Sequence, residues 1–144
     1  MRFFNLDEKM ETSKIKIVKI VKFDFSEQET NTLSLHDKDE QEIIIANILY
    51  MKAEGNYTRI FLNNNKEKVE RILLKYYEEA LSEYGFVRIH RETLVNLKYV
   101  TTIDIKNDKK CFIGEIPLEF SRERLKLLIK SKILFPFMTK NDRL

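Results

Sequence analysis

The stretch Phe86–Asn96 constrains the fold of this chain more than any other, because apolar and cationic residues alternate along its first half. Apolar residues occupy positions 87, 89, 94 and 95, and Arg88, His90 and Arg91 stand between them. Alternation of this kind is typical of a strand with one face buried and the other turned outward. Two arginines and one of only two histidines are thereby placed at the end of a strand. Such an arrangement suits a catalytic corner, an anion site or a nucleic-acid-binding surface.

The composition is that of a globular protein of 144 residues, with 43% hydrophobic and 34% charged residues. We expect one domain with an extension, because that length is enough to bury a core. The longest apolar run, Ile43–Met51, is far shorter than the ~20 residues of a membrane span. The N-terminus turns acidic too soon for a signal peptide. The single cysteine, Cys111, excludes an intramolecular disulfide, so these features together predict a cytoplasmic protein.

The charge is divided unevenly along the chain. Residues 1–42 carry seven Lys/Arg and ten Asp/Glu, whereas residues 43–144 carry nineteen and thirteen. An anionic partner is therefore expected to bind the C-terminal two-thirds.

The first 42 residues are predicted to be an extension or linker that holds one strand. Residues 15–25 are rich in β-branched residues and alternate with one slip, which favours a strand with a bulge. A basic amphipathic helix on a membrane surface is the alternative for this segment. Residues 26–42 are acidic and polar, as in a loosely ordered connection.

A main domain is predicted over residues 43–132. Its first apolar run breaks at Asn47, and two strands follow around a turn at Gly55-Asn56. A second turn is expected at 63–66. Apolar residues at intervals of three and four then predict an amphipathic helix over Arg71–Tyr84, which Gly85 ends.

Beyond Asn96 the pattern returns to strands. Residues 97–105 alternate as a strand, and Cys111–Leu118 is expected to return as a single strand after a polar turn. Ser121 is the predicted N-cap of a short helix, and residues 133–144 are expected to form a C-terminal tail. The fold class is therefore mainly β, or β-rich α+β, with one amphipathic helix and a short C-terminal helix.

Motifs for catalysis or metal binding are scarce. The chain has three glycines, and none has the spacing of a phosphate-binding loop. His36, His90 and Cys111 lack neighbours at metal-ligand spacing. A hydrolase built on His90, Glu92 and Ser121 is a further alternative. We therefore predict no catalytic residues, no metal, no cofactor and no enzyme activity.

The cationic residues are better organised, because each lies at a strand end or in a turn from which a side chain can project. Arginine pairs with guanine edges or phosphate, and Asn, Thr and His contact either. The alternative is that these residues form ordinary surface ion pairs with Glu54, Glu92 and Glu123. The candidate positions are Asn56, Tyr57, Thr58, Arg59, Arg88, His90, Arg91, Arg122 and Arg124.

Three segments together resemble the LytTR family of bacterial DNA-binding domains, the output domains of response regulators. They read ILYMKAEGNYT at 48–58, FVRIHRETLVNL at 86–97 and IPLEFSR at 116–122, with the predicted helix between the first two. The resemblance covers residues 43–132. It implies about ten short, mostly antiparallel strands whose loops enter successive major grooves of DNA without a recognition helix.

The resemblance also implies roles for individual residues. Contacts to bases and backbone carry over to the loop Asn56–Arg59, to His90 and Arg91, and to Arg122. Arg88 matches the arginine of the family's strand and would contact phosphate or brace the loop. Glu92 stands where the family usually has a small polar residue. Arg124 is added from charge and helical spacing alone.

The implied partner is double-stranded promoter DNA carrying direct repeats, bound by a homodimer. The family usually attaches this domain to a receiver domain of ~120 residues, and the 42 preceding residues do not resemble one. The extension is expected to bind a membrane-bound or protein regulator, or to mediate dimerisation. A protein-interaction adaptor or anti-regulator that keeps the fold is the alternative function.

Overall fold

The computed structural model describes residues 15–21, 29–35 and 42–138. Within these ranges the chain forms eleven strands and two α-helices, joined by turns and short 3-10 helices. The helices are α2 (Leu74–Leu81) and α3 (Arg122–Lys130). The strands are β1 (Ile15–Val21), β2 (Glu29–Leu35), β3 (Glu42–Ile44), β4 (Ile48–Glu54), β5 (Tyr57–Leu62), β6 (Glu67–Glu70), β7 (Phe86–His90), β8 (Thr93–Asn96), β9 (Thr102–Asp104), β10 (Lys110–Ile113) and β11 (Ile116–Glu119).

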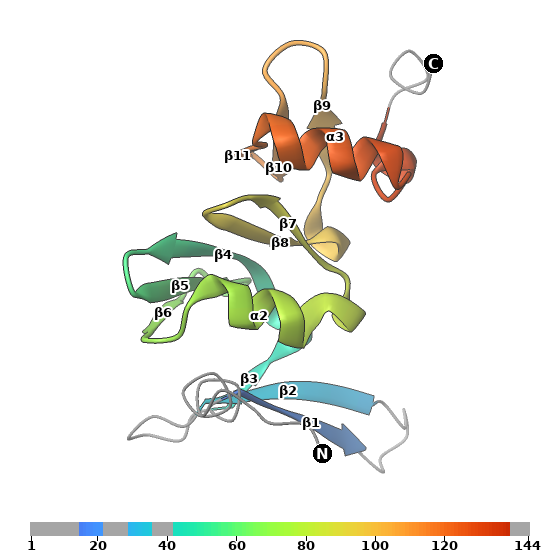
Figure 1. Cartoon of the computed structure of the whole chain (residues 1–144). Helices are drawn as coiled ribbons and strands as arrows, with labels where there is room; N and C mark the ends of the chain where they lie inside the picture. The colour runs from blue at the N-terminus through green and yellow to red at the C-terminus, as the bar shows by residue number, and fades with distance from the viewer. Residues whose placement is uncertain (1–14, 22–28, 36–41, 139–144) are drawn as a thin grey trace, which may run out of the picture.

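The strands form three antiparallel sheets that follow one another along the molecule. The first has the order β1-β2-β3, the central one β6-β5-β4-β8-β7, and the third β11-β10-β9. Figure 1 shows the first sheet at one end, α2 and the central sheet in the middle, and the third sheet with α3 at the other end. The mainly β fold with two helices confirms the predicted fold class.

The central sheet separates two hydrophobic cores, because successive side chains of a strand point to opposite faces. Met51, Ile60 and Leu94 pack against α2 and Leu33 of β2. Val87 and Val95 belong to the second core, with residues of the third sheet and α3. In β7 the predicted alternation places Val87 and Ile89 in the second core and leaves Arg88 and His90 half-buried on the other face, and Phe86 packs in the first core.

Most of the predicted elements are found close to their expected positions. The break at Asn47 is a 3-10 turn, and β4 and β5 reverse at Gly55, which has a φ of 61°. Gly85 ends the helical segment with a φ of 82°, and the Ser121 hydroxyl accepts a hydrogen bond from the Arg124 amide as the N-cap of α3. Residues 15–21 form a strand as predicted, but its register with β2 is unbroken, so the predicted bulge is not found there; residues 22–25 lie outside the described residues.

Three predicted elements are wrong in part, each because of a turn or a distant pairing. Glu29–Leu35 is a strand that pairs with β1 and β3, not a loosely ordered connection. Residues 97–99 form a 3-10 turn, because the Asn96 side chain accepts a hydrogen bond from the Lys98 amide. Gly114, with a φ of 61°, divides the single strand predicted over 111–118 into the β10–β11 hairpin.

The ends of the two helical regions also differ from prediction. Helix α2 begins at Leu74 rather than at Arg71, because Leu73 is extended and the Ile72 carbonyl accepts the Thr58 hydroxyl. Part of the predicted tail is packed, since Leu134 is buried in the second core. The remainder, residues 139–144, lies outside the described residues.

Candidate nucleic-acid interface

Two backbone hydrogen bonds place three of the predicted segments beside one another. The Ala53 amide, just before the β4–β5 turn, donates to the Glu92 carbonyl in the β7–β8 turn at 2.9 Å. The Ser121 amide, at the start of α3, donates to the Ile89 carbonyl of β7, also at 2.9 Å. The β7–β8 turn therefore lies between the β4–β5 turn and the N-terminus of α3, and all three face the same side in Figure 1.

The β7–β8 turn has a defined shape. The register between the two strands shifts between Arg88 and His90, and the Glu92 amide donates to Nδ1 of His90 at 3.1 Å. Because Nδ1 is the acceptor, a neutral ring carries its proton on Nε2. Nε2 is then a hydrogen-bond donor, because only Nδ1 is engaged by the Glu92 amide.

Arg91 and Arg122 are the two most available cations of the predicted set. The Arg91 side chain is 86% exposed, and its contact with Glu92 is long, at 4.0 Å. Exposed ion pairs of this kind contribute little to the free energy of folding. Arg122 is exposed at the first residue of α3 and forms no ion pair with another described residue. The positive end of the helix dipole adds to its attraction for an anion.

The β4–β5 turn contributes neutral groups more than free charge. Asn56 and Tyr57 are exposed, and Tyr57 follows directly on the reversal at Gly55. Arg59 is engaged, because its Nε donates to Glu54 at 2.8 Å and its Nη1 lies 3.9 Å from Glu67. The ion-pair alternative from the sequence therefore describes Arg59 better than a free groove contact does.

The sequence predicts that Thr58 contacts DNA, but in the structure its side chain faces the core. Its side chain is fully buried, and its hydroxyl donates to the Ile72 carbonyl at 2.6 Å. A strand alternates its faces, so the residue after exposed Tyr57 points into the core. Thr58 has no surface to offer a ligand in this structure.

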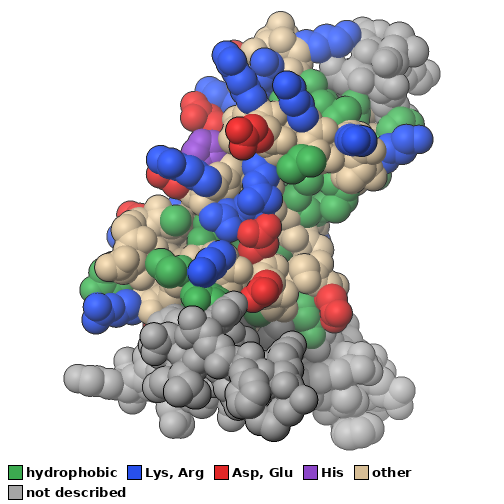
Figure 2. Space-filling view, viewed as in Figure 1, with side chains coloured by type: hydrophobic (Ala, Val, Ile, Leu, Met, Phe, Trp, Pro, Cys, Tyr) green, Lys and Arg blue, Asp and Glu red, His purple; other side chains and the backbone are tan. Residues whose placement is uncertain are grey.

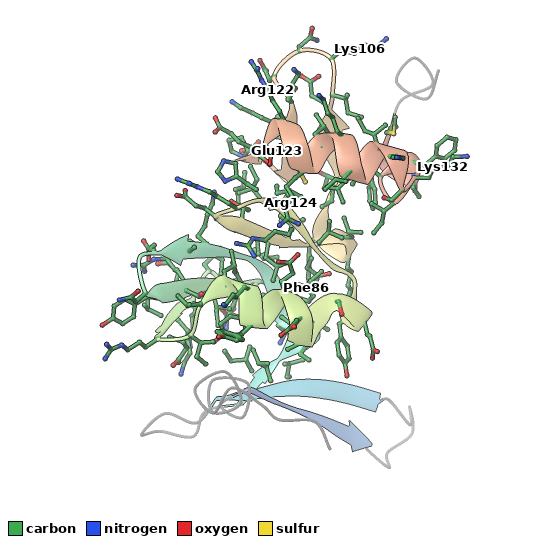
Figure 3. All side chains as sticks on the ribbon, viewed as in Figure 1. Phe86, Lys106, Arg122, Glu123, Arg124 and Lys132 are labelled. Atoms are coloured by element: carbon green, nitrogen blue, oxygen red, sulfur yellow. The ribbon has the colours of Figure 1, made fainter. Side chains whose placement is uncertain are left out.

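Arg88 and Arg124 converge on a residue that sequence reasoning missed. Nη1 of Arg88 lies 2.8 Å from Oε1 of Glu78, and Nη1 of Arg124 lies 3.4 Å from Oε2 of the same carboxylate. Figure 3 shows Arg124 extending from α3 toward α2, which carries Glu78. No sequence signal links Glu78 to partners 10 and 46 residues away, because only the tertiary structure brings them together.

Further cations lie near the third sheet. Figure 2 shows Lys and Arg side chains gathered over the half of the molecule that holds β7, the third sheet and α3, with acidic side chains among them. The β9–β10 loop adds exposed Lys106 and Lys109, neither of which is among the predicted DNA contacts. Lys109 has a φ of 53°, which helps to turn the loop. The basic surface is therefore wider than the three predicted segments.

Other kinds of site have less support. Within the described ranges, no three His, Cys, Asp or Glu side chains come close enough to hold a metal ion. Two surface hollows of about 310 and 150 Å³ both border Leu62, Lys66 and Glu67, and neither is lined by His90. No helix in the described part of the chain is long and apolar enough to cross a membrane.

Comparison with solved structures shows the same fold in another protein. The chain is similar to the "LytTr DNA-binding domain of putative methyl-accepting/DNA response regulator from Bacillus cereus", with a TM-score of 0.52 and 17% identity. The match covers 72% of this chain and 95% of that one. No curated protein sequence matches the chain.

A family model gives the assignment at the level of sequence. The model described as the LytTr DNA-binding domain matches residues 41–132, which is more than half of the chain and close to the predicted 43–132. The matched range holds the three adjoining segments and both helices. This chain belongs to the LytTr DNA-binding domain family.

Proposed function

We propose that this chain is a cytoplasmic transcription regulator that binds promoter DNA by sequence, inserting loops into successive major grooves of direct repeats. One observation carries the proposal: backbone hydrogen bonds join the β4–β5 turn, the β7–β8 turn and the N-terminus of α3 into one row. Side chains that read base edges must project from a rigid scaffold at fixed spacing. The row supplies that scaffold.

The proposed contacts follow from exposure and chemistry. Arg91 and Arg122 are exposed and carry guanidinium groups able to bind guanine O6 and N7 in pairs of hydrogen bonds. Nε2 of His90 is a donor for phosphate or guanine, and Asn56 and Tyr57 supply neutral polar groups beside them. Thr58 is left out because it is buried.

The remaining candidate arginines have supporting roles in this proposal. Arg59 shares its charge with Glu54 and Glu67, so a contact with phosphate would compete with two ion pairs. Arg88 is only 12% exposed and is held by Glu78, as is Arg124. These side chains fix the frame from which Arg91 and Arg122 project.

The proposed assembly is two copies on adjacent direct repeats. Binding of one copy raises the local concentration of any neighbour that it contacts, which increases the affinity for a double site. The strands β1 and β2 lie outside the matched family range and at the opposite end of the molecule from α3 (Figure 1). We place a contact with a membrane-bound or protein regulator on them.

Selection of bound fragments from a genomic library tests the proposal. Sequenced fragments should share a repeated motif, and fluorescence anisotropy should show binding to that motif about 1,000-fold or more tighter than to scrambled duplex. The affinity should fall steeply with salt, because lysine and arginine contacts release counterions. Equal affinity for all duplexes would contradict base reading, and absence of DNA binding would favour the protein-interaction adaptor.

A further inference from the structure

We infer that Glu78 and Arg88 form a clamp that sets the shape of the β7–β8 turn, and with it the base preference of the domain, without either residue touching DNA. The inference rests on the proposed function, since it names the contacts that hold the proposed base-reading turn in place. Glu78 and Arg88 are positioning residues in this scheme.

Arg88 holds the turn by its backbone. Its Nε donates to the His90 carbonyl at 3.0 Å, and its Nη2 donates to the Arg91 carbonyl. Its Nη1 donates to Oε1 of Glu78 at 2.8 Å. A guanidinium group presents its N–H donors in one rigid plane, so these three partners fix the carbonyls of His90 and Arg91 relative to α2.

Glu78 extends the clamp to the second proposed reading element. Its other oxygen, Oε2, accepts from Nη1 of Arg124 at 3.4 Å, so one carboxylate joins α2, β7 and α3. Arg124 stands in the first turn of α3, close to Arg122 in sequence, and Figure 3 shows it between the two helices. The positions of both Arg91 and Arg122 therefore depend on Glu78.

The negative charge of Glu78 allows a positioning role to be distinguished from a direct electrostatic effect on DNA binding. Glu78 is a carboxylate at the rear of a surface proposed to bind phosphate, so its charge by itself opposes binding. Neutralising it should strengthen binding to every duplex if charge alone matters. If Glu78 positions the turn, neutralisation should instead weaken binding to the selected repeat.

The test compares Glu78→Gln with Glu79→Gln in the full chain. Glu79 is the neighbouring exposed residue of α2 and forms no ion pair with another described residue, so it gives the same charge change without the clamp. Affinities for the selected repeat and for scrambled duplex are measured at one salt concentration, and the Tm of each variant is recorded. Glu78→Gln should lower the preference for the repeat about tenfold, the effect of losing one base contact, whereas Glu79→Gln should leave it unchanged.

Arg88→Lys is a second variant that keeps the charge. A lysine cannot reach Glu78 and two carbonyls at once, so it should lose the preference for the repeat while scrambled duplex binds as before. Equal effects of Glu78→Gln and Glu79→Gln, in a chain whose wild type prefers the repeat, would overturn the clamp alone. A wild type with no preference for any duplex would overturn the proposed function and the clamp together.

Discussion

The arginines of this domain differ in what surrounds their charge, and that difference decides their use. Arg59, Arg88 and Arg124 each have a glutamate partner, whereas Arg122 has none among the described residues and Arg91 has only a long contact. A guanidinium already paired must break that pair before it binds DNA. Arg122 has no ion pair to break among the described residues, and Arg91 has only the long, exposed contact with Glu92.

Replacing Arg91 or Arg122 with Ala should therefore cost about 1–3 kcal/mol of binding to the selected repeat and relax the preference at one base position. Lys126→Ala is the matched control, because Lys126 is an exposed cation of α3 outside the row. It should weaken binding to all sequences alike, if at all. Competition anisotropy with single-base variants of the repeat measures both effects, and equal losses on repeat and scrambled duplex would contradict base reading.

Glu92 is an acidic side chain that directly follows Arg91 in the β7–β8 turn. It is 55% exposed and lies 4.0 Å from Arg91, so it is free to meet phosphate. Glu92→Gln should strengthen binding to all duplexes, because one repulsive charge is gone. The slope of log affinity against log salt concentration should become steeper by up to about 1. Salt titrations of anisotropy check this prediction. A loss confined to a cytosine position would show instead that Glu92 accepts from the cytosine amine.

Cys111 should be inert in the native protein. Burial raises the pKa of its thiol to about 12, and only the thiolate reacts with disulfide reagents. At pH 8 a colorimetric thiol assay should detect no reaction in the folded chain and one equivalent in guanidinium chloride. Rapid reaction under native conditions would contradict the buried position in β10.

Among the secondary-structure elements, the junction of α2 and β7 depends on one glycine. Gly85 has a φ of 82°, and its carbonyl accepts the Leu97 amide at 2.9 Å, so the junction also fixes the end of β8. A Cβ added at Gly85 would meet no atom within 4 Å. A substitution at Gly85 therefore destabilises the fold only through the positive φ that the new residue must adopt.

Gly85→Ala should destabilise the fold by about 1 kcal/mol, because alanine adopts positive φ at a cost. Gly85→Asn should cost less, since asparagine visits the left-handed region more readily. Urea denaturation followed by circular dichroism compares the two variants. Equal losses for Ala and Asn would point to a cause other than φ.

The three sheets together show that the N-terminal strands are part of the fold. Leu33 of β2 is fully buried and packs in the same core as Ile43, Ile48 and Leu94. Deleting residues 1–40 would therefore remove a core side chain along with any regulatory surface. A truncation cannot separate the two effects.

Leu33→Ala should lower the free energy of unfolding by about 2–5 kcal/mol, because it leaves a cavity between β2 and the central sheet. DNA affinity of the folded fraction should not change, since Leu33 lies at the end of the molecule away from the proposed interface. Calorimetry and anisotropy on the same sample measure both quantities. An unchanged Tm would contradict the burial of Leu33.

Much of the architecture could be predicted from local patterns. Alternating apolar and polar residues predict the strands, and apolar residues at intervals of three and four predict α2. Gly85 predicts the end of the helical segment. These features depend only on side-chain directions and backbone sterics within a few residues. The same patterns gave the row of candidate segments and, with the family resemblance, the DNA-binding class. They did not find β2, whose polar sequence becomes a strand only by pairing with β1 and β3.

Only the tertiary structure decided which polar residues of the row are free to bind. Thr58 is buried because β5 turns that face to α2, and Arg88 and Arg124 are held because Glu78 lies between them. The sequence by itself determined that arginines stand at strand ends. The partner of Arg88 and Arg124 comes from α2, 10 and 46 residues away, so which arginines remain available depends on packing between the elements.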